Sequence, residues 1–168
     1  SELPKFMFSF VPPEPAKLPK LIMVNNSLCK KLNLDFSSLK EKDVASILSG
    51  NSLPAGSKTI SQAYAGHQFG FLTMLGDGRA TMLGEHVVNK KKRFDIQLKG
   101  SGKTPYSRGA DGRAALGPVV REYMVGESMH CLGIPTTRAL AIVSTGETVM
   151  REKPTMGAVL TRVAKSHI

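Results

Sequence analysis

The 168-residue chain contains no tryptophan, and aromatic residues of all kinds make up only 6% of it. Proteins that bind single-stranded nucleic acid stack the bases on aromatic side chains, so this scarcity argues against a specific nucleic-acid-binding module. Cysteine is also rare: Cys29 and Cys131 lie too far apart in sequence for a metal knuckle or a redox pair. We expect both to be buried thiols rather than a disulfide.

Long apolar runs are missing as well. No window approaches the roughly 20 apolar residues that a membrane-spanning helix requires, and residues 1–20 lack the basic region and continuous apolar core of a secretory signal. We therefore expect a soluble protein without a membrane partner, in the cytoplasm. The 41% of hydrophobic and 21% of charged residues are typical of a globular domain, and 168 residues suffice for one domain or one lobe of a larger protein.

Acidic residues are few, since 13 Asp and Glu stand against 23 Lys and Arg and give a net charge of +10. Such a charge attracts anions, of which nucleotide phosphate and nucleic acid are the obvious candidates. The densest basic cluster is KKKR at 90–93, directly before an apolar strand. Its simplest interpretation is the solvated tip of a hairpin.

Residues 1–60 are expected to form an N-terminal arm and short helices. Proline is frequent over 1–20, where it removes backbone donors and disfavours helix, so this part is expected to be extended. Helices are predicted over 26–34 and 38–48. In the second, Ser38 stands three residues before Glu41, which is a capping-box arrangement. The residues of that helix expected to be buried are Leu39, Val44, Ile47 and Leu48.

Residues 61–168 carry the signals of a sheet and one long helix. Two apolar runs, starting at Phe69 and Ala80, flank residues 76–79 and predict a hairpin with glycines at the bend. Further strands are predicted over 94–99, 139–144, 148–151 and 158–163. Apolar residues at helical spacing predict a helix over 116–132 that stops at Gly133. The predicted fold class is α+β, with a mostly antiparallel sheet and this helix packed against it.

Residues 95–113, DIQLKGSGKTPYSRGADGR, contain the letters GSGKT, which end the phosphate-binding loop of many nucleotide enzymes. That loop requires glycine where this chain has Gln97, and it must run straight into a helix, whereas Pro105 excludes helical backbone at Thr104. What remains is a dense set of groups that suit a phosphate, namely glycines that expose backbone donors and fixed cations. They are Lys99, Gly100, Gly102, Arg108, Gly112 and Arg113.

Asp111 lies within this set although a carboxylate repels phosphate. It fits an organised site if it orients a lysine, an arginine or a metal ion. The alternative is an exposed glycine-rich loop in which Asp111 caps the helix that starts near Ala114.

Three parts follow one another along the chain: the glycines at 76–78, Lys99 at a strand end, and Glu122 on the predicted long helix. Kinase-like folds use the same order, in which a glycine hairpin covers ATP, a lysine meets its phosphates and a helical glutamate holds the lysine. We therefore predict an ion pair between Lys99 and Glu122. The plain alternatives are a simple turn at 76–79 and an exposed carboxylate beside Arg121.

Six segments closely resemble the selenoprotein O family: YAGHQFG (64–70), LGDGRA (75–80), LKGSGKTPYSR (98–108), DGRAAL (111–116), VREYMVGESMHCLGIPTTRAL (120–140) and VLTRVAKSHI (159–168). The resemblance implies a protein-kinase-like fold, of which residues 61–168 would be the N-terminal, nucleotide-binding lobe. It implies transfer of AMP from ATP to Ser, Thr or Tyr hydroxyls of protein substrates. ATP would lie flipped relative to a protein kinase, with the terminal phosphate deep and the α-phosphate facing the acceptor.

The resemblance also implies site residues. ATP contacts are expected at Gly76, Gly78, Arg79, Lys99, Asp111, Gly112 and Arg162, with Glu122 as the partner of Lys99. The catalytic aspartate, the ligands of Mg²⁺ or Mn²⁺ and a further arginine are expected beyond Ile168, and a redox cysteine or selenocysteine motif at the far C-terminus of the family. We therefore expect residues 1–168 alone to be inactive, to bind ATP weakly and to be prone to self-association through an uncovered face.

Two alternatives remain beside an adenylyltransferase lobe. One is an ordinary phosphotransferase that uses the same parts, and the other is a basic nucleic-acid-binding module.

Overall fold

The computed structural model describes residues 3–68 and 70–167. Its main sheet has the strand order β1-β3-β6-β7-β10-β9-β2, and the short β8 pairs with β10. Every one of these pairings is antiparallel. The strands are β1 (Phe8–Phe10), β2 (Lys20–Val24), β3 (Ile60–Gln62), β6 (Ala80–Asn89), β7 (Lys92–Lys99), β8 (Ala114–Ala115), β9 (Arg138–Met150) and β10 (Pro154–Ala164).

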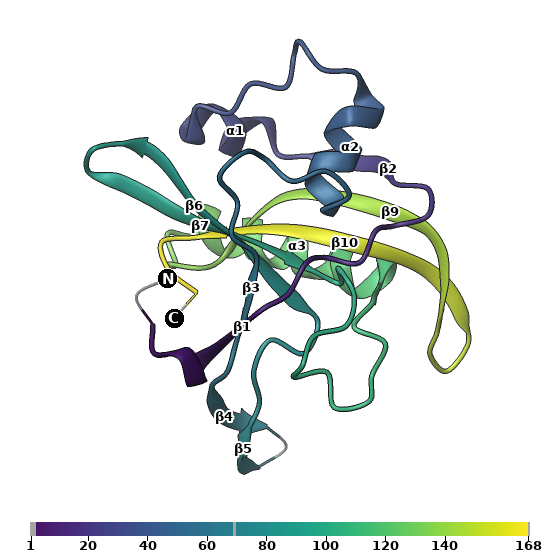
Figure 1. Cartoon of the computed structure of the whole chain (residues 1–168). Coiled ribbons are helices and arrows are strands. Elements are labelled where there is room, and N and C mark those ends of the chain that lie inside the picture. The colour runs from purple at the N-terminus through teal and green to yellow at the C-terminus, as the bar shows by residue number, and fades with distance from the viewer. Residues whose placement is uncertain (1–2, 69, 168) are drawn as a thin grey trace.

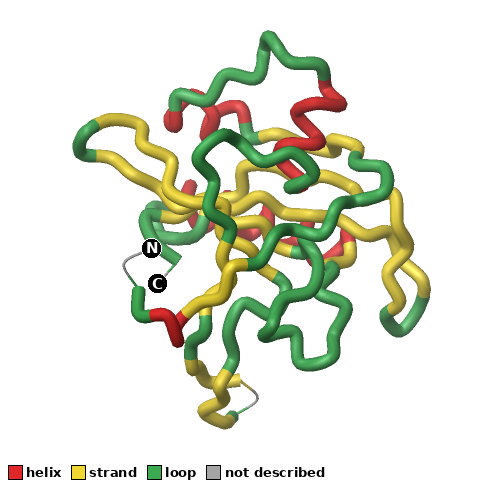
Figure 2. The backbone as a smooth tube through the Cα atoms, viewed as in Figure 1, coloured by secondary structure: helices red, strands yellow, loops and turns green. Residues whose placement is uncertain are grey.

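Helices lie on both faces of this sheet. Helices α1 (Asn26–Leu32) and α2 (Glu41–Ser49) lie over one face, and α3 (Leu116–Cys131) lies behind the sheet in Figures 1 and 2. A single-turn 3₁₀ helix, η1 (Lys5–Met7), precedes β1. The predicted α+β class with a mostly antiparallel sheet and a packed helix is therefore confirmed.

Alternation along β10 assigns its side chains to the two faces, as strand geometry requires. Thr161 and Val163 point to the side of α1 and α2, where the Thr161 hydroxyl donates to the carbonyl oxygen of Leu48. Ala158 and Leu160 pack on the other side, in a cluster with Val119 of α3. Arg162, which follows Leu160 by two positions, therefore lies on the α3 side as well.

Helix α3 confirms the helix predicted over 116–132 nearly to the residue, and Gly133 follows it in a left-handed conformation with φ 78°. Its apolar stripe ends at Tyr123, because the next turn carries Glu127, which pairs with Arg138. Cys131, in the last turn, is consequently exposed, so the expectation of a buried thiol there is wrong. Cys29 on α1 is buried as expected.

The second N-terminal helix differs from the prediction at its start. Lys40 occupies the N-cap position of α2, and the preceding residues form a turn in which Leu39 N donates to Phe36 O, so the capping box of Ser38 and Glu41 is wrong. Leu39 is 41% exposed, contrary to expectation. Farther along the helix the expected pattern returns: Ile47 is half-buried, and Val44 and Leu48 are buried.

The hairpin predicted around residues 76–79 is wrong in its pairing. Strand β5 (Phe71–Met74) pairs with β4 (Ala65–Gln68), whereas β6 pairs with β3 and β7. The chain reverses beside Gly70, and Phe69, where the prediction began, lies outside the described residues. Leu75 N donates to Tyr64 O and Asp77 N to Gln62 O, both at 2.8 Å.

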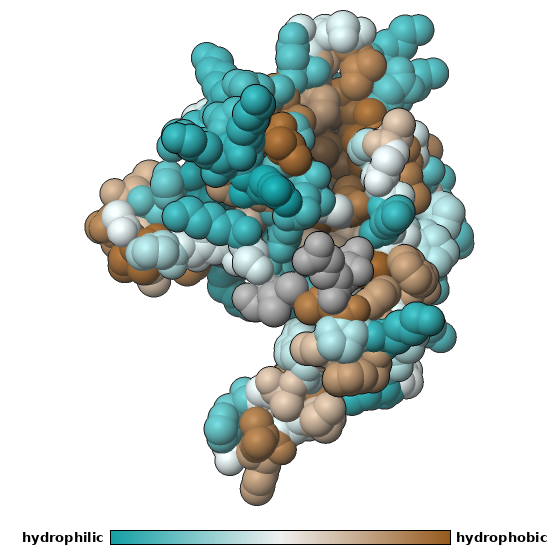
Figure 3. All heavy atoms as spheres, turned by 60° about the vertical axis from the view of Figure 1, so that its left-hand side comes forward, coloured by the Kyte–Doolittle hydropathy of each residue, from teal (hydrophilic) through white to brown (hydrophobic). Residues whose placement is uncertain are grey.

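Strands β3 and β4 therefore run along β5 and β6 as one two-stranded ribbon, whose bend lies beside Gly70. Residues 76–79 lie between β5 and β6 within this ribbon and do not form its bend. The outer part of that ribbon, β4 and β5, projects from the lower end of the molecule in Figure 3, with the apolar side chains of Phe71, Leu72 and Met74 exposed.

Two further expectations concern the remaining strands. The strands predicted over 139–144 and 148–151 belong to the single strand β9, which continues through Gly146 and ends at Met150, one residue before the predicted end. The basic cluster at 90–93 does lie at a hairpin tip, between β6 and β7 (Figure 1).

Among the helices of residues 3–68 and 70–167, none is long and apolar enough to cross a membrane.

Candidate nucleotide site

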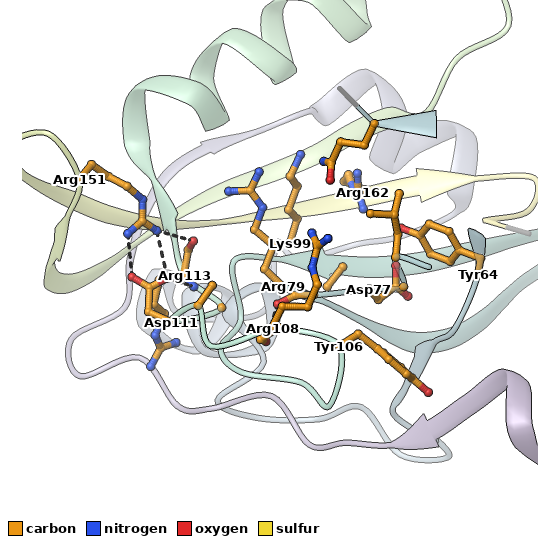
Figure 4. Close-up of a pocket in the computed structure, with 18 residues that line it drawn as sticks. Tyr64, Asp77, Arg79, Lys99, Tyr106, Arg108, Asp111, Arg113, Arg151 and Arg162 are labelled. Atoms are coloured by element: carbon orange, nitrogen blue, oxygen red, sulfur yellow. Dashed lines mark hydrogen bonds and ion pairs between the residues drawn. The ribbon is translucent and has the colours of Figure 1, made fainter. Parts of the chain in front are cut away.

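A hollow of about 540 Å³ opens between the segment 75–80, the loop 106–113 and the ends of β7 and β10 (Figure 4). Its volume lies in the range of small-molecule sites. Among the residues that line it are Gly76, Gly78, Arg79, Lys99, Asp111, Gly112 and Arg162. The fold thus brings together, at one hollow, every residue for which the sequence predicted an ATP contact.

The pairing of β7 with β10 places two of the cations side by side. Lys99 lies opposite Leu160, and Gln97 lies opposite Arg162, so Lys99 and Arg162 share the face that α3 covers. Glu122 of α3 contacts both of them. Its Oε2 accepts from the Lys99 ammonium, and its Oε1 accepts from Arg162 Nη1 at 3.2 Å.

Burial and the neighbouring charges together set the pKa values of Lys99 and Glu122. Burial lowers the pKa of Lys99, and the hydrogen bond and charge of Glu122 counteract this shift. Burial alone would raise the pKa of Glu122, but Lys99 and Arg162 outweigh it, so that the pKa of this carboxyl lies below its ordinary value. Glu122 is therefore a stable anion that holds two cations at the hollow.

A second acidic residue, Asp77, belongs to residues 76–79, which we call the glycine segment. Asp77 is 5% exposed, and its Oδ2 accepts from Gln62 N at 3.0 Å and from Gln97 Nε2 at 3.4 Å. Gln97 Oε1 in turn accepts from Arg162. Burial raises the pKa of Asp77, with the hydrogen bond from Gln62 N opposing the shift. A chain of contacts thus runs from the glycine segment through Gln97 to Arg162.

Hydroxyl groups of the loop 100–113 hold the glycine segment in place. Thr104 Oγ1 donates to Asp77 O at 2.6 Å, and Ser107 Oγ donates to Gly78 O at 2.6 Å. Both hydroxyls also accept, since Tyr106 N donates to Thr104 Oγ1 at 3.1 Å and Thr104 N to Ser107 Oγ at 2.8 Å. We call this pair of side chains, Thr104 and Ser107, the hydroxyl latch.

The close fit of the two loops explains why the segment has glycines. A Cβ on Gly76 would lie 2.7 Å from Tyr106 Cγ, and a Cβ on Gly78 would lie 2.9 Å from Tyr106 O. In the loop 100–113, a Cβ on Gly112 would lie 2.0 Å from Gly102 O. Glycine is therefore required at these positions by backbone packing, whether or not a ligand is bound.

Asp111 orients a cation that sequence reasoning missed. Its two oxygens accept from both terminal nitrogens of Arg151, at 2.7 Å and 3.0 Å, and Arg113 N donates to Oδ1 at 2.9 Å. The hydrogen bonds from Arg151 hold the pKa of Asp111 below its ordinary value. The alternative role as a helix cap is wrong, because Ala115 occupies the N-cap position of α3.

The residues that the sequence did not single out share one property: their partners are distant in the chain. Arg151 lies 40 residues from Asp111, and Gln97 lies 65 residues from Arg162. Asp77 alone left a local signal, since it stands between Gly76 and Gly78, but there an aspartate is also typical of a turn. Within the described part of the chain, no three His, Cys, Asp or Glu side chains come together in a way that could hold a metal ion.

An antiparallel sheet, a helix packed on one face of it, and a strand lysine in contact with a helical glutamate define the N-terminal lobe of a protein-kinase-like fold. Comparison with known proteins agrees. The family model described as Protein adenylyltransferase SelO matches residues 1–168. The chain belongs to this family, which confirms the resemblance to selenoprotein O.

Individual relatives carry the name protein nucleotidyltransferase YdiU. The one from Geobacillus kaustophilus is 60% identical over 168 residues, which are all of this chain and 35% of the relative. Those from Clostridium botulinum and Pelagibacter ubique are 58% and 55% identical over the same 168 residues, which are 34% and 35% of the relatives. The chain thus spans about a third of the length of the curated relatives it matches.

Proposed function

We propose that this chain is the ATP-binding lobe of a protein adenylyltransferase, which transfers AMP from ATP to Ser, Thr or Tyr hydroxyls of protein substrates. The observation that carries the proposal is the convergence of Arg79, Lys99 and Arg162 on one hollow, in a chain of the SelO family. A triphosphate that leaves water requires fixed charges of opposite sign. These three cations would supply them.

The proposed roles follow from the contacts. Lys99 and Arg162, oriented by Glu122, would bind the deeper phosphates, and the backbone of Gly76 and Gly78 would allow a close approach of the phosphate chain. The acceptor oxygen would attack the α-phosphorus, the bond to the β-phosphate oxygen would break, and pyrophosphate would leave. We place the catalytic aspartate and the ligands of Mg²⁺ or Mn²⁺ beyond Ile168.

Labelled ATP separates this proposal from the phosphotransferase alternative. The full-length protein is incubated with Mg²⁺ or Mn²⁺, acceptor proteins and ATP that carries the label at either the α- or the γ-phosphate. We expect label from the α-position on the protein acceptor. Label from the γ-position alone would make the chain part of a kinase instead.

Removal of the lysine tests the site itself. In the full-length protein, Lys99→Ala removes a charge-assisted contact to phosphate, so the Kd for ATP should rise by about 10- to 100-fold, measured by calorimetric titration. Lys103→Ala is the matched control, because Lys103 is exposed and is not among the described residues that line the hollow. An unchanged Kd for Lys99→Ala would contradict the proposed site.

A nucleic-acid-binding module would behave differently. It would bind DNA or RNA with an affinity that falls steeply with salt, in proportion to the phosphates neutralised. We expect only weak and nonspecific binding of this kind.

A further inference from the structure

Some of the cationic side chains that line the hollow have no carboxylate partner. Six cationic side chains line it: Arg79, Lys99, Arg108, Arg113, Arg151 and Arg162. Lys99 and Arg162 share Glu122, Arg113 contacts Glu14 and Glu147, and Arg151 pairs with Asp111. Within residues 3–68 and 70–167, Arg79 and Arg108 pair with no carboxylate.

Arg108 occupies a backbone position that does not suit arginine. Its φ is 52° and that of Gly109 is 82°, and Ala110 N donates to Ser107 O at 2.9 Å. Two successive left-handed residues closed by such a hydrogen bond are typical of a type I′ turn, which favours glycine, asparagine or aspartate. The turn alone therefore does not explain an arginine with an exposed side chain at this position.

The hydroxyl latch places Arg108 next to the glycine segment. Ser107, the residue before Arg108, donates to the carbonyl oxygen of Gly78, the residue before Arg79. Arg79 and Arg108 thus each directly follow one of the two residues that this hydrogen bond joins. Figure 4 shows the side chains of Arg79, Lys99 and Arg108 around the same hollow.

We propose that Arg108 is a further nucleotide-binding residue, whose guanidinium binds the phosphate chain together with Arg79. This inference rests on the proposed function, because it takes the ligand to be ATP. An arginine suits the role, since its planar guanidinium offers several donors to phosphate oxygens. The disfavoured backbone conformation is then a consequence of the direction in which the side chain must point.

The test uses two variants that suit the turn better than arginine does. Arg108→Asn and Arg108→Gly both remove the charge, and both residues accept a positive φ, so neither should lower the melting temperature. In the full-length protein, we expect the Kd for ATP to rise by about tenfold or more in each variant. Lys103→Ala is again the control for the loss of one positive charge from the same loop.

Inorganic tripolyphosphate identifies the part of the ligand that Arg108 contacts. It has neither base nor sugar, so its affinity, measured by displacement of a fluorescent ATP analogue, should fall by the same factor as that of ATP. A loss for ATP but not for tripolyphosphate would place the contact at the base or the sugar and overturn the proposal. A loss that Lys103→Ala reproduces would overturn it too, because the effect would be one of general charge.

The remaining outcomes separate this inference from the proposed function. If both Arg108 variants bind ATP as tightly as the parent protein while Lys99→Ala does not, only the role of Arg108 is wrong. If the parent protein itself fails to bind ATP, the proposed function fails together with this inference.

Discussion

Removal of one hydroxyl of the latch tests whether Thr104 and Ser107 hold the glycine segment in place. Thr104→Val keeps the shape of the side chain and removes only its hydroxyl. Two backbone groups then lose their partner: the buried Asp77 O, which accepts at 2.6 Å, and the partly buried Tyr106 N, which donates at 3.1 Å. Because Thr104 is only 9% exposed, water does not readily replace the lost contacts.

The expected magnitude follows from these two bonds. Each net hydrogen bond of this kind contributes about 1 kcal/mol, so Thr104→Val should lower the free energy of unfolding by about 2 kcal/mol. In a protein as long as the curated relatives, of which this chain spans about a third, that is a fall of about 2 °C in melting temperature. The released segment must also be ordered again when ATP binds. If that ordering costs about 1 kcal/mol, the Kd for ATP rises by about fivefold.

A matched control lies on the opposite face of the sheet. Thr161 is fully buried, and its hydroxyl donates to Leu48 O at 2.7 Å. Thr161→Val removes this one hydrogen bond, so it should lower the free energy of unfolding by about 1 kcal/mol and keep the parent affinity for ATP. Both variants are compared in the full-length protein by thermal melting and by calorimetric titration. Equal weakening of ATP binding by the two variants, or a Thr104→Val variant with unchanged stability and affinity, would show that the latch does not hold the glycine segment for the nucleotide.

Two further predictions concern single positions of the same site. Asp77→Asn should stabilise the protein, because the amide oxygen still accepts from Gln62 N and no charge is buried. Burial raises the pKa of Asp77 above its ordinary value of 3.8. The gain should therefore be complete above the raised pKa and disappear as the pH falls toward 3.8, which urea denaturation across pH would show. A gain that grows toward low pH would contradict this. Gly112→Ala should lower the free energy of unfolding by about 3 kcal/mol or more, because the new Cβ would lie 2.0 Å from Gly102 O. Gly56 also has a positive φ, of 84°, but its Cβ would meet no described atom within 4 Å. Gly56→Ala should therefore lower the free energy of unfolding by only about 1 kcal/mol. Equal losses in the two variants would show that backbone strain, and not the close contact, determines the loss.

Much of the lobe was predictable where one strong local signal sufficed. The spacing of Leu116, Val119, Val120 and Tyr123 identified α3, and the alternation before Lys99 identified the end of β7. These signals are local because a helix or a strand buries one side of itself. The contact between Lys99 and Glu122 was anticipated from the order of parts along the chain.

The errors arose where distant strands decide the pairing. Strand β3 has only the three residues Ile60–Gln62, which are too few to show an apolar pattern. The sequence therefore did not identify β3 as the partner of β6, and residues 76–79 were interpreted as a bend. Glycine misled in the same way at Gly146, where β9 continues with φ 70° close to Leu18. The partner of Asp111, Arg151, comes from a turn 40 residues away, which no local pattern could identify.

Glu122 on α3 accepts hydrogen bonds from Lys99 on β7 and from Arg162 on the neighbouring strand β10. Because both cations contact the same carboxylate, they depend together on the position of the helix. A displacement of the helix away from the sheet by a few ångströms would separate Glu122 from Lys99 and from Arg162 in the same movement. The two positive groups would lose their common anchor together, so the site would respond to the position of the helix as a single unit.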